Sequence, residues 1–307
     1  MASVLIIKLG ALGDLVQADG AMRDIREHHS DDRITIMTTP AYRRYAERCP
    51  WVDEVFLDPR ASRFNLPRMF SLAAELRDRD FDRVYDLQQV GRTRFYKRWL
   101  FPKVDWLGDV KGCNYYLRRP DDSCAADHFA RHLVMAGISV QHTLQNNVSW
   151  MADDVDDILG AAELKPGFVV LIPGASAIHD GKRWPYFKDF AERLLAHGRQ
   201  VVTIPGPEEL DLCRTIPGTM LVEPGGYHDF FTLAGIVLKA GFVIGNDTGP
   251  THIAAHLQCP GLALYGPHTS PASTGIQHSR FSWIEAPNLN ELSVDAVWEK
   301  LGLRGFC

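Results

Sequence analysis

The 307-residue chain has no apolar run as long as the roughly 18 residues that a membrane-spanning helix needs. Its six cysteines are scattered without a CxxC pair, so we expect neither a disulfide framework nor a zinc knuckle, and reduced thiols fit a cytoplasm best. The apolar stretch near the start is only about four residues long, so we expect no secretory signal. A basic excess is missing too, since 33 Lys and Arg stand against 38 Asp and Glu, and no nucleic-acid partner is expected.

The charge is distributed unevenly along the chain. Residues 1–150 hold 22 Lys and Arg against 20 Asp and Glu, whereas residues 151–307 hold 11 against 18. The first half is therefore the better host for an anionic partner or a membrane surface.

Short apolar runs alternate with helical patterns in both halves, which predicts two Rossmann-like α/β domains with mostly parallel sheets. A hydrophobic content of 46% and a charged content of 23% are those of a soluble globular protein. We place a linker within residues 141–166 and assign residues 1–160 and 161–307 to the two domains. The expected strands are residues 4–7, 34–38, 54–57, 83–86 and 104–107, then 168–172, 201–204, 220–222, 242–245, 261–265 and 282–284.

The stretch Ala240–His256 predicts an anion site, because an apolar strand breaks at a Gly-Asn-Asp-Thr-Gly-Pro turn into a helix. The free N–H groups of Thr248 and Gly249 and the helix dipole would stabilise a phosphate. Asp247 would accept from a sugar hydroxyl, and His252 would donate a hydrogen bond beside the pocket. The alternative is an ordinary capped helix.

The segment Lys8–Asp14 forms a glycine turn between the first strand and a helix. Gly10 and Gly13 suit a loop that a ligand approaches, but the dinucleotide fingerprint GxGxxG is incomplete. Asp14 is either a helix cap or a carboxylate that faces the ligand crevice at the carboxyl end of the sheet. Gln88 follows the fourth strand and places a further polar group at that edge.

Basic residues follow the strands of the first half, and they either form a solvated face or bind a large anionic acceptor. Aromatic residues at 95, 96 and 99 interleave with one group, which favours the acceptor. The candidates for acceptor binding are Arg60, Arg63, Gln88, Arg92 and Arg94.

Two loops of the second half suit a nucleotide. In residues 173–185, small residues including Ser176 leave room for a ligand, and Lys182 can offset the charge of a diphosphate. Glu208 and Glu209 follow the next strand, where a carboxylate can accept from ribose hydroxyls, although either could instead begin a surface helix.

We expect no metal and no cofactor. His128 and His132 lack a third ligand, and the pair His252 and His256 lacks the glutamate of a zinc protease. Asp154-Val-Asp156 has the DxD pattern of some sugar transferases, but it lies in an acidic surface stretch.

Four separate stretches together resemble one family over nearly the whole chain. They are KLGALGD (8–14), DLQ (86–88), PGAS and GKRWP within 173–185, and NDTGPTHIAAHL (246–257) with YGPHTSP (265–271). This pattern is similar to the ADP-heptose:lipopolysaccharide heptosyltransferase family, glycosyltransferase family 9.

The resemblance implies a GT-B fold, with two Rossmann-like domains facing each other across a cleft. The acceptor would bind the first domain and the nucleotide-sugar the second, and the last helix is expected to pack back on the first domain. Transfer of heptose from ADP-heptose to a lipopolysaccharide core acceptor would be inverting and metal-independent, with Asp14 as general base and Lys182 stabilising the leaving diphosphate. Donor binding would fall to Gly13, Ser176, Lys182, Glu208 or Glu209, Asp247, Thr248, Gly249 and His252.

The chain departs from the family where some members carry two threonines before the lysine, because Ala177 and Ile178 stand there. Another nucleotide-sugar, a non-lipopolysaccharide acceptor, a GT-B nucleotide-sugar epimerase and a non-catalytic binding protein therefore stay open as alternatives. The lipid-linked acceptor implies a cytoplasmic protein, peripheral on the inner membrane.

Overall fold

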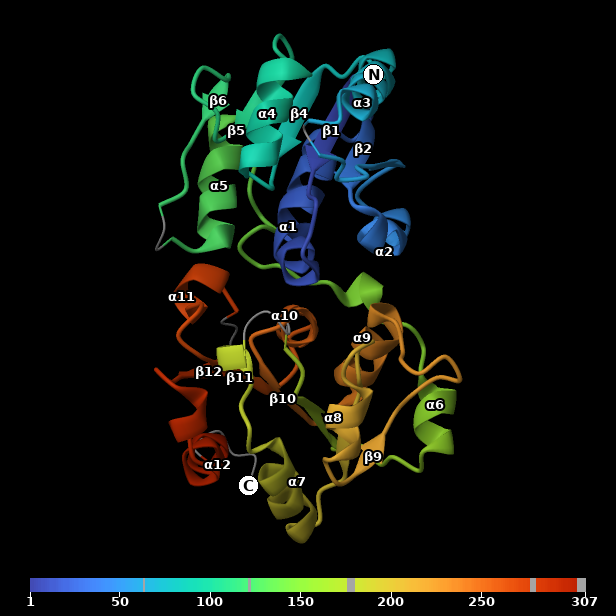
Figure 1. The fold of residues 1–307 in the computed structure, drawn as a ribbon, viewed down its shortest axis with the longest axis vertical. Helices are drawn as coiled ribbons and strands as arrows, with labels where there is room; N and C mark the ends of the chain where they lie inside the picture. The colour runs from blue at the N-terminus through green and yellow to red at the C-terminus, as the bar shows by residue number, and fades with distance from the viewer. Residues whose placement is uncertain (63, 121–122, 176–179, 277–279, 303–307) are drawn as a thin grey trace. The chain divides into compact units, whose positions relative to one another are not determined.

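The computed structural model describes residues 1–62, 64–120, 123–175, 180–276 and 280–302. The chain divides into two compact units, residues 1–150 and 151–307. The division lies after Trp150, whereas the sequence analysis placed it after residue 160. Each unit is an α/β layer structure around its own sheet (Figure 1).

The first unit is built on a six-stranded parallel sheet in the order β3-β2-β1-β4-β5-β6. Its strands are β1 (Ser3–Ile7), β2 (Arg33–Thr38), β3 (Glu54–Leu57), β4 (Arg83–Asp86), β5 (Asp105–Gly108) and β6 (Tyr115–Tyr116). Five of them were expected within about one residue, whereas the two-residue β6 was missed because so short a segment carries no periodicity.

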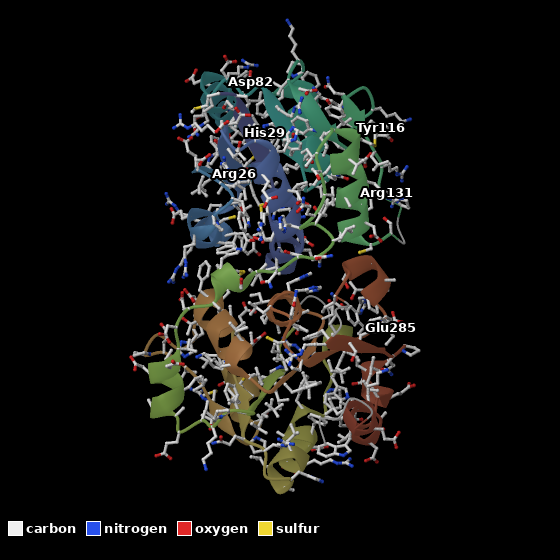
Figure 2. All side chains as sticks on the ribbon, turned by 180° about the vertical axis from the view of Figure 1, so that it is seen from behind. Arg26, His29, Asp82, Tyr116, Arg131 and Glu285 are labelled. Carbon is white, nitrogen blue, oxygen red and sulfur yellow. The ribbon has the colours of Figure 1, made fainter. Side chains whose placement is uncertain are left out.

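The helices of this unit are α1 (Leu12–His28), α2 (Arg43–Arg48), α3 (Leu66–Asp78), α4 (Gly91–Trp99) and α5 (Ala125–Met135), with a 3₁₀ turn η1 (Pro40–Tyr42). A second 3₁₀ turn, η2 (Ser149–Met151), includes the boundary between the two units. Helix α1 follows strand β1, in which Val4 to Ile7 are fully buried, and ends at His28. Near this end the guanidinium of Arg26 donates to the carbonyls of His29 and Asp32. Arg26 and His29 lie together near this end in Figure 2, and the Arg26 guanidinium ties the helix to the turn that follows it.

The second unit repeats the same topology in the order β12-β11-β10-β7-β8-β9, again all parallel. Its strands are β7 (Val169–Ile172), β8 (Val201–Thr203), β9 (Thr219–Met220), β10 (Phe242–Asn246), β11 (Gly261–Tyr265) and β12 (Phe281–Glu285). Its helices are α6 (Asp156–Ala161), α7 (Phe187–Ala196), α8 (Leu210–Arg214), α9 (Phe230–Lys239), α10 (Gly249–His256), α11 (Pro271–Thr274) and α12 (Val294–Gly302), with a 3₁₀ turn η3 (Asp180–Lys182).

Helix α12 packs within the second unit. Val297 and Leu301 belong to the buried cluster that contains Trp184 and Phe190, and the Trp298 ring meets Phe190 edge-on with centroids 6.1 Å apart. The apolar side of this helix thus completes the second core, and its packing on the first domain stays a prediction.

Both sheets reverse their strand order at one point, between β1 and β4 in the first and between β7 and β10 in the second. Crevices at the carboxyl ends of the strands beside such a reversal are the usual ligand sites of open α/β sheets. The segments that follow these four strands therefore define where each unit can bind.

Candidate functional site

Asn246, the last residue of β10, fixes the loops around the reversal point of the second sheet. Its side-chain amide donates to the carbonyl of Pro173 at 2.8 Å, and its oxygen accepts the backbone N–H of Trp184 at 3.1 Å. Asn246 is fully buried, so these bonds form in a low dielectric. One side chain thereby ties both ends of the loop 173–185 to the end of β10, a role that the sequence analysis missed because its partners lie over 60 residues away.

Asp247 follows directly and is the charged centre of the second unit. Its carboxylate accepts from Lys182 Nζ at 3.0 Å, from His252 Nε2 at 3.1 Å and from the hydroxyl of Thr269. Burial by itself would raise the pKa of this carboxyl, but the bonds and charges of these three donors hold the pKa well below its ordinary value. Asp247 is therefore a permanent anion that can accept from a hydroxyl.

Helix α10 begins beside Asp247 with Thr248 in an extended conformation at the N-cap and Gly249 as its first residue. No side chain in the described part of the chain caps this end. The Thr251 hydroxyl turns inward and donates to the carbonyl of Asn246 at 2.6 Å. Among the described residues no side chain occupies the first N–H groups of the helix, and an anion could accept from them, which is the role that the sequence predicts.

Lys182 reaches this cluster from the 3₁₀ turn η3, with its side chain 16% exposed. The neighbouring Arg183 donates to the carbonyl of Ala175 at 2.9 Å and so braces the loop. Gly181 packs so tightly that an added Cβ would lie 2.7 Å from Nε2 of His268. Lys182, Asp247 and His252 are brought together as their motifs suggested, whereas Ser176, with Ala177 and Ile178, lies outside the described residues.

The two glutamates after β8 differ in their surroundings. Glu209 accepts the N–H of Gly206 at 2.9 Å, and a Cβ on Gly174 would lie 1.6 Å from its carboxylate, so Glu209 faces the loop after β7. Glu208 is exposed to solvent. The geometry therefore favours Glu209 as the carboxylate that lies beside a ligand.

In the first unit, Asp14 lies in the first turn of α1 and its carboxylate accepts the N–H of Ala11 at 3.1 Å. Gly13 precedes it in the same turn and Asp14 itself is exposed. Gln88 lies beside the same edge, where its side-chain oxygen accepts the N–H of Leu9 at 2.8 Å. Asp14 thus caps the helix, and the Asp14 carboxylate is also exposed to solvent at the carboxyl end of the sheet.

Lys8, the first residue after β1, is buried beneath this turn and donates to the carbonyl of Leu87 at 3.0 Å. Burial lowers the pKa of its ammonium, while the charges of Asp14 and Asp86 raise it. Burial also raises the pKa of Asp86 to about 6, against hydrogen bonds from the N–H groups of Gln89 and Gln88. Lys8 is thus a buried cation between two carboxylates, which sequence motifs alone did not single out.

The histidine pair of α5 forms a buried relay with Gln89. Gln89 Oε1 lies 2.8 Å from His128 Nε2, Gln89 Nε2 lies 3.0 Å from His132 Nδ1, and His132 Nε2 lies 2.7 Å from the carbonyl of Tyr115. Because the two carbonyl oxygens only accept, both rings carry their proton on Nε2. Burial lowers the pKa of His128 to about 4, which agrees with neutral rings. The pair is engaged with Gln89 and the Tyr115 carbonyl rather than aimed at a shared ligand.

Comparison with known proteins shows which family the chain belongs to. A model of glycosyltransferase family 9 (heptosyltransferase) matches residues 129–293, more than half of the chain. The chain belongs to glycosyltransferase family 9. The lipopolysaccharide heptosyltransferase 2 of Escherichia coli is 23% identical over 309 residues, which cover 90% of this chain and 86% of that protein.

Solved structures support the same fold. A family 9 glycosyltransferase from Veillonella parvula matches with a TM-score of 0.78 at 19% identity, over 99% of this chain and 89% of that one. The E. coli heptosyltransferase WaaC with ADP-2-deoxy-2-fluoro heptose matches with a TM-score of 0.74 at 16% identity, over 98% and 99%. The expected GT-B type of two Rossmann-like domains is confirmed, and the protein is a glycosyltransferase. None of its described helices is long and apolar enough to cross a bilayer.

The arginines proposed for the acceptor take different positions in the glycosyltransferase. Arg92 is bound bidentately to the fully buried Asp58, with Nη2 at 2.7 Å from Oδ1 and Nε at 2.8 Å from Oδ2. Arg94 donates to both the carbonyl and the carboxylate of Asp109. Arg60 is exposed, and Arg63 lies outside the described residues. Arg92 thus has a structural partner, and acceptor binding by these residues stays a prediction.

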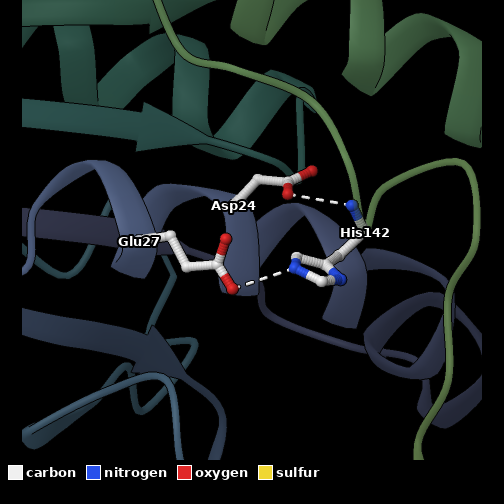
Figure 3. A group of neighbouring side chains, drawn as sticks. All are labelled: Asp24, Glu27 and His142. Atoms are coloured by element: carbon white, nitrogen blue, oxygen red, sulfur yellow. Dashed lines mark hydrogen bonds and ion pairs between the residues drawn. The ribbon is translucent and has the colours of Figure 1, made fainter.

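One cluster of the glycosyltransferase, made of Asp24, Glu27 and His142, has the composition of a metal site (Figure 3). Asp24 accepts the N–H groups of Gln141 and His142 on one oxygen and the N–H and hydroxyl of Thr143 on the other. These four bonds occupy the lone pairs a cation would need. The cluster therefore fastens the segment 141–143 to α1, where the sequence analysis expected a loose linker.

Proposed function

We propose that the protein transfers a heptose from ADP-heptose to a lipopolysaccharide core acceptor, by an inverting reaction without a metal ion. The observation that carries the proposal is the cluster of Lys182, ionised Asp247 and the uncapped start of α10 at the reversal point of the second sheet. A cation and helix N–H groups suit a diphosphate, and a carboxylate beside them suits a sugar hydroxyl. Membership of family 9 gives the reaction class.

The donor proposal follows from the same residues. The diphosphate would lie on the N–H groups of Thr248 and Gly249, with Lys182 offsetting its charge. Donor binding by Gly13 and Ser176 stays the prediction that the family resemblance implies. Asp247, supported by His252, would accept from the heptose. Glu209, which faces the loop after β7, would accept from the ribose hydroxyls, while the exposed Glu208 would take no part.

The chemical step is a single displacement. Asp14 removes the proton from the acceptor hydroxyl as its oxygen attacks the anomeric carbon from the side opposite the diphosphate. The bond from the anomeric carbon to the diphosphate oxygen breaks, and ADP leaves with the electron pair. Lys182 and the α10 dipole offset the charge that develops there, which is the task that a metal ion performs in other transferases.

The acceptor in this proposal is anionic and lipid-linked, bound by Gln88 and by the arginines at 60, 63 and 94, while Arg92 stays paired with Asp58. Such an acceptor places the enzyme in the cytoplasm, at the inner face of the inner membrane. The first half of the chain, with its slight basic excess, is the half that supports this assignment.

The test is ADP release from ADP-heptose with a heptose-deficient lipopolysaccharide acceptor, beside UDP-, GDP- and dTDP-sugars. We expect acceptor-dependent release from ADP-heptose that persists in excess EDTA. Release from another donor would reassign the sugar, epimerisation without acceptor would indicate a nucleotide-sugar epimerase, and loss of activity in EDTA would contradict the metal-free step. The anomeric configuration of the product, read by NMR, decides whether transfer inverts.

A further inference from the structure

Three large apolar side chains that are close together in the sequence are exposed to solvent at the start of α3. Phe64 is 92% exposed, Leu66 is 61% exposed and Phe70 is 72% exposed. Single exposed apolar residues are ordinary on a protein surface, but three such side chains within seven positions form a patch that needs a partner.

The fold of the unit does not need these side chains. Helix α3 fills the core with its other face, since Met69, Leu72 and Leu76 are buried in the cluster around the sheet. Leu66 and Phe70 are one helical turn apart and share the outer face. Farther along the helix that face continues with the charged, exposed Arg77. The apolar exposure is thus confined to the first two turns of the helix and the residues before it.

The same stretch carries only positive charge. Between Arg60 and Phe70 the sequence has three arginines and no acidic residue. Arg68 is exposed and forms no ion pair with a carboxylate in the described ranges. The neighbouring Asp58 is fully buried and neutralised by Arg92. A partner for this patch should therefore be apolar inside and negatively charged at its surface.

The start of α3 also lies at a particular edge of the first unit. Because the strands are parallel, each helix that follows a strand begins at their carboxyl edge, so α3 after β3 starts at the same edge as α1 with Asp14 (Figure 1). A patch at this edge is on the side of the unit where the acceptor would be bound.

We propose that Phe64, Leu66 and Phe70, together with Arg68, dock the protein on the surface of an anionic lipid bilayer. The aromatic and leucine side chains enter the boundary between headgroups and acyl chains, and the arginine pairs with anionic headgroups. Docking would bring the enzyme to the lipid-linked acceptor of the proposed function, and to that extent it rests on that proposal. The docking itself requires only the lipids.

The experiment is flotation of the full-length protein with phosphatidylcholine vesicles, with and without phosphatidylglycerol. We expect binding that requires phosphatidylglycerol and weakens with salt. Phe64→Ser and Phe70→Ser should each lower the partition coefficient about tenfold, and Arg68→Gln about fivefold. The matched controls Trp99→Ser, 68% exposed at the end of α4, and Arg98→Gln should leave it unchanged.

Several outcomes would overturn the proposal. Equal partition of Phe64→Ser, Phe70→Ser and wild type would show that another surface binds lipid, and salt-independent absence from vesicles would rule out docking altogether. A wild-type dimer that Phe70→Ser converts to a monomer would assign the patch to a second copy of the chain. A water-soluble acceptor fragment separates docking from catalysis, because Phe64→Ser should release ADP with it as fast as wild type.

Discussion

The buried carboxylate of Asp19 should make the stability of the first unit depend on pH. Asp19 lies on α1, is 1% exposed, and accepts on one oxygen from the hydroxyl of Tyr45 and from the indole N–H groups of Trp51 and Trp150. Burial raises its pKa to about 7, although these three bonds lower it. We predict that Asp19→Asn removes this dependence, since the amide keeps an acceptor oxygen but carries no charge.

The sign and the size follow from the two pKa values. A folded pKa of about 7 exceeds the unfolded value of about 3.9, so the folded state holds a proton that the unfolded chain loses first. Stability is therefore greatest at acid pH and falls as the pH rises through 7. A shift of about three units corresponds to about 4 kcal/mol, of which about 3 kcal/mol is lost between about pH 5 and about pH 8.

The assay is urea unfolding of wild type and Asp19→Asn across this range. The difference in stability between the two proteins isolates Asp19, because both contain Asp86 and His128, whose shifted pKa values contribute equally to the pH dependence of each. Since Trp51 and Trp150 donate to Asp19, tryptophan emission of folded wild type should also titrate near pH 7, and that of Asp19→Asn should not. The exposed Asp31→Asn is the matched control. We expect the free energy of unfolding of Asp19→Asn minus that of wild type to increase as the pH rises. A value that is independent of pH, or that decreases as the pH rises, would refute the reasoning.

Three further predictions concern the proposed reaction. Asp14→Asn should lower turnover by roughly two to four orders of magnitude and leave the affinity for ADP, measured by calorimetry, unchanged. Turnover near that of wild type would contradict the assignment of Asp14 as the general base. Lys182→Ala should weaken ADP binding by about ten- to a hundredfold, the worth of charge-assisted bonds, and unchanged affinity would count against its role at the diphosphate. Glu209→Gln should weaken ADP binding about tenfold while Glu208→Gln leaves it intact, and the reverse order would exchange their assignments.

The strands could be predicted because parallel strands buried on both faces leave continuous apolar runs in the sequence. β1 and β10 are such runs, and the glycine turns after them mark the ligand edge of each sheet. Asp14, Lys182 and Asp247 could be singled out as candidates for the same reason, since each follows such a strand or belongs to a loop with a distinctive composition. The β6 strand was missed because two residues have no pattern.

Partnerships between distant residues could not be predicted. Arg92 belongs to a basic run that suggests an anionic ligand, yet its partner Asp58 lies 34 residues earlier and is buried under it. Asp24 holds a segment almost 120 residues away. In both pairs the sequence shows an ordinary charged residue. Only the packing of one element on another decides whether that residue pairs with a group inside the protein or stays free to bind a ligand.

That distinction bears on how the proposed reaction can proceed without a metal ion. Lys182 already pairs with Asp247, and because three donors hold the pKa of Asp247 low, this carboxylate stays ionised and holds Lys182 Nζ in place. An incoming diphosphate would share the lysine with a fixed anion, while Thr269 and His252 continue to satisfy Asp247. The lysine would therefore be preorganised before the donor arrives, and the charge that grows on the leaving group would meet a cation that needs no rearrangement.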